Sequence, residues 1–294
     1  YPFPDVLTTA PAGNMVAWTF NERGQRNIYV AVAPDFTPRR LTSYLRDDGQ
    51  ELTSLVFSSD GTRLVYVRGG AHSSNWPAEG NLAPDPAGDP VQPKVQVWSI
   101  AVAGGTPVLL GDGDFPAVAP RTNVVAFERD RRIWVAPIDG SKPAEPYFFA
   151  RGTSQTPTWS PDGATLAFVS NRDDHSFIAL YTPGQPIRYL APSTSRDSSP
   201  AWSRDGKEIA WVRQPGRGGT PRSSLLQAPS PWAIWVAPVD PAAPPTVDSP
   251  ECAWIGQRIL QTPEKGADTL VWLADAEAGT DYPSGEYFVR RRVR

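Results

Sequence analysis

The sequence predicts an all-β fold, a β-propeller of about five recognisable blades, because one turn phrase recurs along the chain with a strand after each copy. Clear copies occupy residues 57–61, 159–163 and 202–206, and degenerate copies begin at Thr9 and Val118. Successive copies start 48, 61, 41 and 43 residues apart. One strand–turn–strand phrase in every 40 to 50 residues or so is typical of a propeller.

The turn phrase has the composition of a tight hairpin turn. In residues 159–163, Pro161 presets φ at the first central position, Asp162 can accept bonds from backbone amides, and Gly163 tolerates a positive φ. The apolar residues 166–169 that follow suit a buried, pleated strand.

Two further phrases follow the turns and predict the outer strands of each blade. The first, rich in β-branched and aromatic residues, occupies 28–31, 97–100, 133–136, 175–181 and 234–237. The second is present in several units, at 39–42, 107–110 and 187–190. Each unit is therefore predicted to be a three- or four-stranded blade. A β-sandwich with similar turns is the alternative, but sandwiches do not repeat side-chain phrases in phase.

Composition excludes several classes of protein. A net charge of -3 predicts no strong field for nucleic acid or a membrane surface, and no apolar run reaches the length of a membrane span. The single cysteine, Cys252, cannot form an intrachain disulfide. We expect no cofactor and no metal site, because His72 and His175 lie 103 positions apart without ligand-like spacing around either.

The cellular compartment predicted from the sequence depends on how the N-terminus arose. The chain does not begin with Met. It is expected to be periplasmic or secreted if its N-terminus was trimmed after export, and cytoplasmic otherwise.

Two insertions interrupt the blade rhythm, at about residues 69–93 and 213–231, and each joins two strands of one blade. Long loops in compact domains are often functional. The candidate binding residues are side chains of the first insertion and acids just before the second-blade strand: His72, Asn75, Trp76, Glu79, Asp47, Asp48 and Glu51. Carboxylates suit a peptide's free amino group. A packed surface loop and ordinary surface acids are the alternatives.

Residues 1–240 resemble the N-terminal propeller of bacterial prolyl oligopeptidase-family serine peptidases of the dipeptidyl-peptidase and acylaminoacyl-peptidase type. The resemblance is carried by the turn phrases and by residues 20–24, 75–86 and 167–172. It implies a propeller that gates a separate α/β-hydrolase domain and holds the end of a peptide substrate. TolB-like propellers share the turns, so a non-enzymatic protein-interaction propeller is the alternative.

The catalytic half of such a peptidase has no counterpart in this sequence. No G-x-S-x-G elbow is present, the nearest segment being 152–156, and no histidine follows His175. We therefore assign no catalytic residue and expect the chain to be inactive alone. Its predicted function is to gate or bind peptide substrate, with a peptide or a protein as partner.

The C-terminal tail departs from the blade pattern. Residues 241–250 read as a Pro/Ala-rich linker and 251–294 as a helix followed by a strand, with Thr262 as helix cap and Pro263 at the first helical position. This tail resembles the C-terminal end of a short-chain dehydrogenase/reductase, without its glycine-rich loop. The sequence thus predicts a fusion of two fragments and an incomplete or irregular propeller ring.

Overall fold

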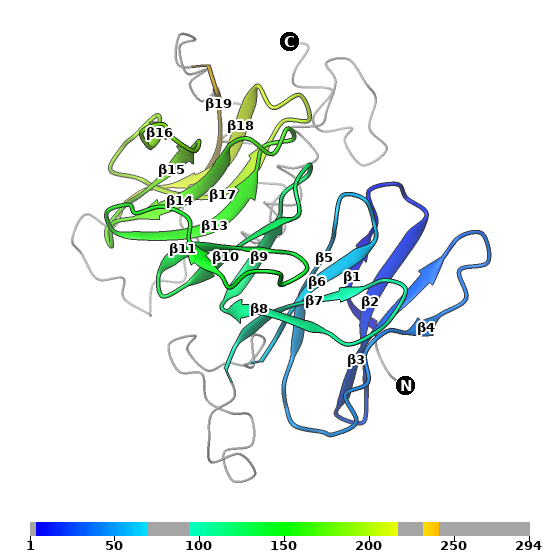
Figure 1. Cartoon of the computed structure of the whole chain (residues 1–294). Coiled ribbons are helices and arrows are strands. Elements are labelled where there is room, and N and C mark those ends of the chain that lie inside the picture. Colours follow the sequence, from blue (N-terminus) through cyan, green and yellow to red (C-terminus); the bar gives the residue numbers. More distant parts are fainter. Residues whose placement is uncertain (1–3, 70–93, 217–231, 241–294) are drawn as a thin grey trace. The chain divides into compact units, whose positions relative to one another are not determined.

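The computed structural model describes residues 4–69, 94–216 and 232–240, which form strands and turns without any helix (Figure 1). The chain divides into two compact units, Tyr1–Phe149 and Ala150–Arg294, and each is described by itself. The predicted linker and the helix-plus-strand tail lie outside the described residues.

The first unit contains three four-stranded antiparallel sheets, and each sheet is one blade. Blade 1 is β1 (Pro4–Thr9), β2 (Met15–Glu22), β3 (Gln25–Val32) and β4 (Arg39–Arg40). Blade 2 is β5 (Leu52–Phe57), β6 (Arg63–Arg68), β7 (Gln96–Ala101) and β8 (Val108–Asp112). Blade 3 is β9 (Asp114–Val118), β10 (Val124–Arg129), β11 (Arg132–Pro137) and β12 (Glu145–Pro146).

The second unit contains blades 4 and 5, which share one seven-stranded sheet. Blade 4 is β13 (Thr153–Trp159), β14 (Leu166–Asn171), β15 (Ser176–Tyr181) and β16 (Arg188–Leu190). Blade 5 is β17 (Arg196–Trp202), β18 (Glu208–Gln214) and β19 (Ala233–Pro238). A single parallel pairing, Ser176 with Arg196, joins the two blades.

The predicted all-β, propeller-like architecture is confirmed. The strands expected after the five turns are β2, β6, β10, β14 and β18, and the next phrases form β3, β7, β11, β15 and β19. The third phrases form β4, β8 and β16. Within each blade the strand order follows the sequence order, so neighbouring strands are consecutive along the chain.

A serine–aspartate pair closes the clear copies of the turn. Ser160 Oγ donates to Asp162 Oδ1 at 2.5 Å and accepts from the backbone N–H of Thr165 at 2.9 Å. Gly163, at φ +73°, donates its N–H to the Ser160 carbonyl. The same network recurs at Ser58 with Asp60 and at Ser203 with Asp205. Asp162 Oδ1 also accepts the backbone N–H of Ala164 at 3.0 Å, which confirms the role predicted for the aspartate.

These turns give the fold a specific acid sensitivity. Hydrogen bonds from Ser58 and from the Thr62 backbone hold the pKa of Asp60 below its usual value of 3.8, and bonds from Ser203 and the Lys207 backbone lower that of Asp205. A carboxyl whose pKa is lower in the folded state stabilises the fold above its unfolded pKa, and this stabilisation is lost as pH falls through the folded value.

The double variant Asp60→Asn/Asp205→Asn is therefore expected to lose less stability than the parent between pH 7 and pH 3. The midpoint of urea unfolding at the two pH values measures this. Asp35→Asn, at an exposed aspartate outside these turns, is the matched control. An equal reduction in the pH dependence of stability in the control would contradict the role given to Asp60 and Asp205.

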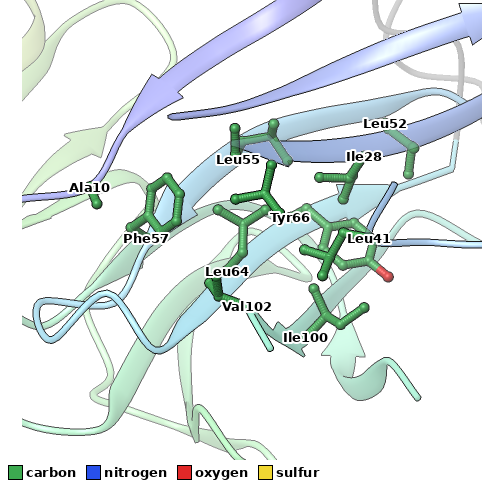
Figure 2. Packing of buried hydrophobic residues seen from close by; sticks show 12 residues of the cluster. Ala10, Ile28, Leu41, Leu52, Leu55, Phe57, Leu64, Tyr66, Ile100 and Val102 are labelled. Atoms are coloured by element: carbon green, nitrogen blue, oxygen red, sulfur yellow. The ribbon is translucent and has the colours of Figure 1, made fainter. Parts of the chain in front are cut away.

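The core of the first unit lies between neighbouring blades, and β6 shows how. Leu64 and Tyr66 pack with Ile28 of blade 1, whereas the alternate residues Val65 and Val67 pack with blade 3. Figure 2 shows the first of these clusters, with Leu64, Tyr66 and Ile28 close together. Because successive side chains of a strand point to opposite faces, a strand between two blades is apolar on both.

The first strand of every blade contains a β-bulge that sequence patterning did not predict. Each register shift coincides with a non-glycine residue at a φ between 49° and 54°: Val6, Ser54, Phe115, Thr156 and Ser199. In blades 3 to 5 the next residue is a proline, which has no N–H to offer the ladder. The bulge changes which side chains face inward, so that Leu52, Leu55 and Phe57 are all buried.

Candidate functional site

Three of the predicted site residues, Asp47, Asp48 and Glu51, lie together in the loop that enters β5; we call residues 44–51 the acidic loop. A buried amide of blade 1 anchors its start. Asn27 Nδ2 donates to the Tyr44 carbonyl at 2.9 Å, and its Oδ1 accepts from the Tyr44 N–H at 2.7 Å. The loop is therefore fixed to blade 1 at one end and continues into the innermost strand of blade 2 at the other.

Asp48 is paired with an arginine. Arg68 Nη2 donates to Asp48 Oδ2, and the guanidinium lies over the Tyr44 ring, 4.2 Å from its centroid. The Tyr44 hydroxyl is 2.7 Å from that of Tyr66. Burial raises the pKa of both tyrosines, so both stay neutral near pH 7. The charge of Asp48 is thus compensated within the protein.

Asp47 and Glu51 differ from Asp48 in their surroundings. The Asp47 side chain is 66% exposed, and Arg26 Nη1 lies 3.9 Å from its Oδ1. An exposed pair at that distance contributes little. Glu51 is half-buried, and its carbonyl oxygen accepts the N–H of Gly69 at 3.1 Å. Asp47 therefore carries the more accessible negative charge of the loop.

The other predicted residues, His72, Asn75, Trp76 and Glu79, lie outside the described residues. The ends of their insertion are described. At Gly69 (φ +123°) a Cβ atom would stand 2.4 Å from the Lys94 carbonyl oxygen. Only glycine permits this approach. The chain thus leaves β6 and returns to β7 at one place, next to the acidic loop.

A related ion pair precedes the second insertion. Arg213 donates from Nε to Asp197 Oδ1 at 2.6 Å and from Nη2 to Oδ2 at 2.8 Å, and both residues are buried. Its Nη2 also donates to the Ala191 carbonyl, and the guanidinium lies 4.1 Å from the Trp235 ring centroid. Burial raises the pKa of Asp197, and the bonds from Arg213 oppose that rise.

This pair corrects the expected start of the second insertion. The sequence predicts that the insertion begins at about Arg213, whereas β18 continues to Gln214 and the buried pair with Asp197 holds Arg213 in the strand. Arg68 and Arg213 each stand seven residues after the turn glycine of their blade, Gly61 and Gly206. That shared position is the sequence signal that predicts both pairs.

Three further observations concern the remaining histidine, metal ligands and membrane-spanning helices. His175 Nδ1 lies 2.5 Å from Asp174 Oδ1, and its ring meets the Phe177 ring edge-on. Within the three described ranges, no group of three or more His, Cys, Asp or Glu side chains is placed to hold a metal ion. In the same residues, no helix of a length and hydropathy that would cross a membrane is found.

The fold and the site define a β-propeller module with an acidic loop at the entry of an inner strand. No family model matches the chain. It is 37% identical over 75 residues to the uncharacterized peptidase YuxL of Bacillus subtilis (strain 168), a match that spans 25% of this chain and 11% of that protein.

A similar solved structure agrees on the fold. A prolyl endopeptidase structure gives a TM-score of 0.56 at 12% identity, covering 83% of this chain and 35% of that one, and at this identity the likeness shows the fold alone. The putative TolB from Agrobacterium tumefaciens gives 0.49 at 18% identity, covering 81% and 78%, a score too low to bear on the fold. The chain spans about a third of the endopeptidase chain that it matches.

Proposed function

We propose that this chain is the propeller module of a prolyl oligopeptidase-family serine peptidase and that it gates or binds peptide substrate. The 37% identity with a protein named as a peptidase carries the proposal. The propeller fold supports it. The sequence contains no G-x-S-x-G elbow and no histidine after His175, so the chain is expected to bind peptides without cleaving them.

The acidic loop supplies the chemistry of binding. A free peptide amine is an ammonium with three donors, and carboxylates are its natural acceptors. Asp47 is proposed to take this ammonium, because its side chain is 66% exposed, and Glu51 is proposed to assist it from the other end of the same loop. Asp48 and Arg68 then act as positioning residues that hold the loop. The side chains of His72, Asn75, Trp76 and Glu79 remain predicted contributors; they belong to the insertion whose described ends, at Gly69 and Lys94, lie next to the acidic loop.

Calorimetric titration with the tripeptide Ala-Pro-Ala tests this function. The free-amine peptide is expected to bind, and its N-acetylated form to bind at least tenfold more weakly, because a charge-assisted hydrogen bond contributes about 1.5–3 kcal/mol. Asp47→Asn/Glu51→Gln is expected to abolish the difference between the two peptides. Binding should also weaken as pH rises through the amine pKa of about 8.

Asp35→Asn, an exposed acid elsewhere in blade 1, is the matched control and should leave the affinity unchanged. Equal affinity for the free and acetylated peptides would contradict the role of the acidic loop. A protein that binds neither peptide would overturn the proposed function and favour the non-enzymatic interaction propeller. Hydrolysis blocked by a serine-directed inhibitor would overturn the expectation of inactivity.

A further inference from the structure

One buried side chain of the acidic loop forms no hydrogen bond. Gln50 is 3% exposed, and neither its Oε1 nor its Nε2 has a hydrogen-bond partner. Its backbone N–H donates to Asp48 Oδ1 at 3.1 Å. Burial of a carboxamide without partners is unfavourable, because the group loses its bonds to water and gains none.

A second buried amide of the same unit shows the contrast. Asn27 is 4% exposed, and its Nδ2 and Oδ1 bond the backbone of Tyr44. Its amide therefore stabilises the fold. Gln50 has the same side-chain amide three residues from Asp47 and one from Glu51, yet this amide forms no hydrogen bond in the folded protein. Departures from the rules of stability are expected at functional positions.

We propose that Gln50 is a ligand-binding residue whose carboxamide pairs with a backbone amide of a bound peptide. A carboxamide has both an acceptor and a donor, and so matches the N–H and C=O of a peptide group. The inference rests on the proposed function: the ammonium is held by Asp47 and Glu51, and Gln50 takes the next peptide group that has an N–H, which in Ala-Pro-Ala is the Pro–Ala group.

Binding requires Gln50 to exchange its buried rotamer for one directed at the surface of the loop, where Asp48 and Glu51 are partly exposed. The unpaired amide raises the free energy of the unliganded state, so formation of its bonds to a peptide favours the bound state. An internal water molecule bonded to the amide is the competing explanation.

The variant Gln50→Leu separates the two explanations. If the amide is paired only in the complex, Gln50→Leu is expected to raise the Tm of the free protein by about 2–4 °C. The same variant should bind free-amine Ala-Pro-Ala at least tenfold more weakly, because it loses the bonds of the carboxamide to both the N–H and the C=O of the peptide group. Gln50→Met is a second apolar variant in case leucine does not fit. Asn27→Leu is the matched control and is expected to lower the Tm.

A peptide analogue tests the pairing directly. With the wild-type protein, an Ala-Pro-Ala analogue whose single peptide N–H, in the Pro–Ala group, is replaced by an ester oxygen should bind about fivefold more weakly, the effect of one lost hydrogen bond of ordinary strength. With Gln50→Leu, amide and ester should bind equally, as required of two changes that remove one interaction.

A lower Tm and unchanged affinity in Gln50→Leu and Gln50→Met would assign the amide to an internal water and overturn the inference. A persistent preference for amide over ester in these variants would also overturn it. Failure of the proposed function appears separately, in the wild-type protein, as no binding of free-amine peptide, and would overturn both.

Discussion

Replacement of Arg213 with methionine is expected to lower the free energy of unfolding by about 3–5 kcal/mol, because it leaves the buried carboxylate of Asp197 without its partner. Arg213 donates two hydrogen bonds to that carboxylate and one to the Ala191 carbonyl. Urea unfolding followed by tryptophan fluorescence measures the loss.

The equivalent substitution in blade 2 is the matched control. Arg68→Met removes an ion pair at the same position after the turn, but its partner Asp48 is partly exposed, so water can solvate the remaining charge. A loss of about 1 kcal/mol or less is expected there. The double variant Asp197→Leu/Arg213→Met should recover most of the loss, since a buried pair can be replaced by apolar residues of similar volume. Equal losses at Arg68 and Arg213 would show that burial does not set the cost.

Phe127→Ala is expected to destabilise the first unit by a similar amount, about 3–5 kcal/mol. The Phe127 ring is fully buried in the cluster between blades 2 and 3 and packs against two glycines. A Cβ on Gly111 would stand 3.0 Å from its Cζ, and one on Gly113 would stand 2.7 Å from its Cδ2. Surroundings that close around the ring cannot collapse fully into the space it leaves.

Phe115→Ala provides the comparison within the same blade. Phe115 is 53% exposed at the bulge of β9, so its truncation is expected to change the free energy of unfolding by about 0.5 kcal/mol or less. Chemical denaturation of both variants, at one temperature and pH, gives the difference. Comparable losses would mean that Phe115 is covered in solution.

The candidate site shows which of its features can be predicted from the sequence and which cannot. The position of Asp47, Asp48 and Glu51 before the second-blade strand places them in one loop, as expected. Their different surroundings come from residues distant in sequence. Arg68 reaches Asp48 only because β5 and β6 pair antiparallel, with Leu52 opposite Arg68. The unpaired amide of Gln50 is likewise a property of burial, which no spacing rule shows.

The sequence by itself determined the blades of this protein, because each turn is closed by hydrogen bonds within six residues, such as those of Ser160 with Asp162 and Thr165. Local interactions of this kind leave a repeated phrase that can be read directly. Only the tertiary structure decided three features. These are the bulges in the first strand of each blade, the burial of the Asp197–Arg213 pair and the lack of hydrogen bonds to the Gln50 side chain. These depend on the register between strands and on which side chains exclude water, and both are set by packing between segments that lie far apart along the chain.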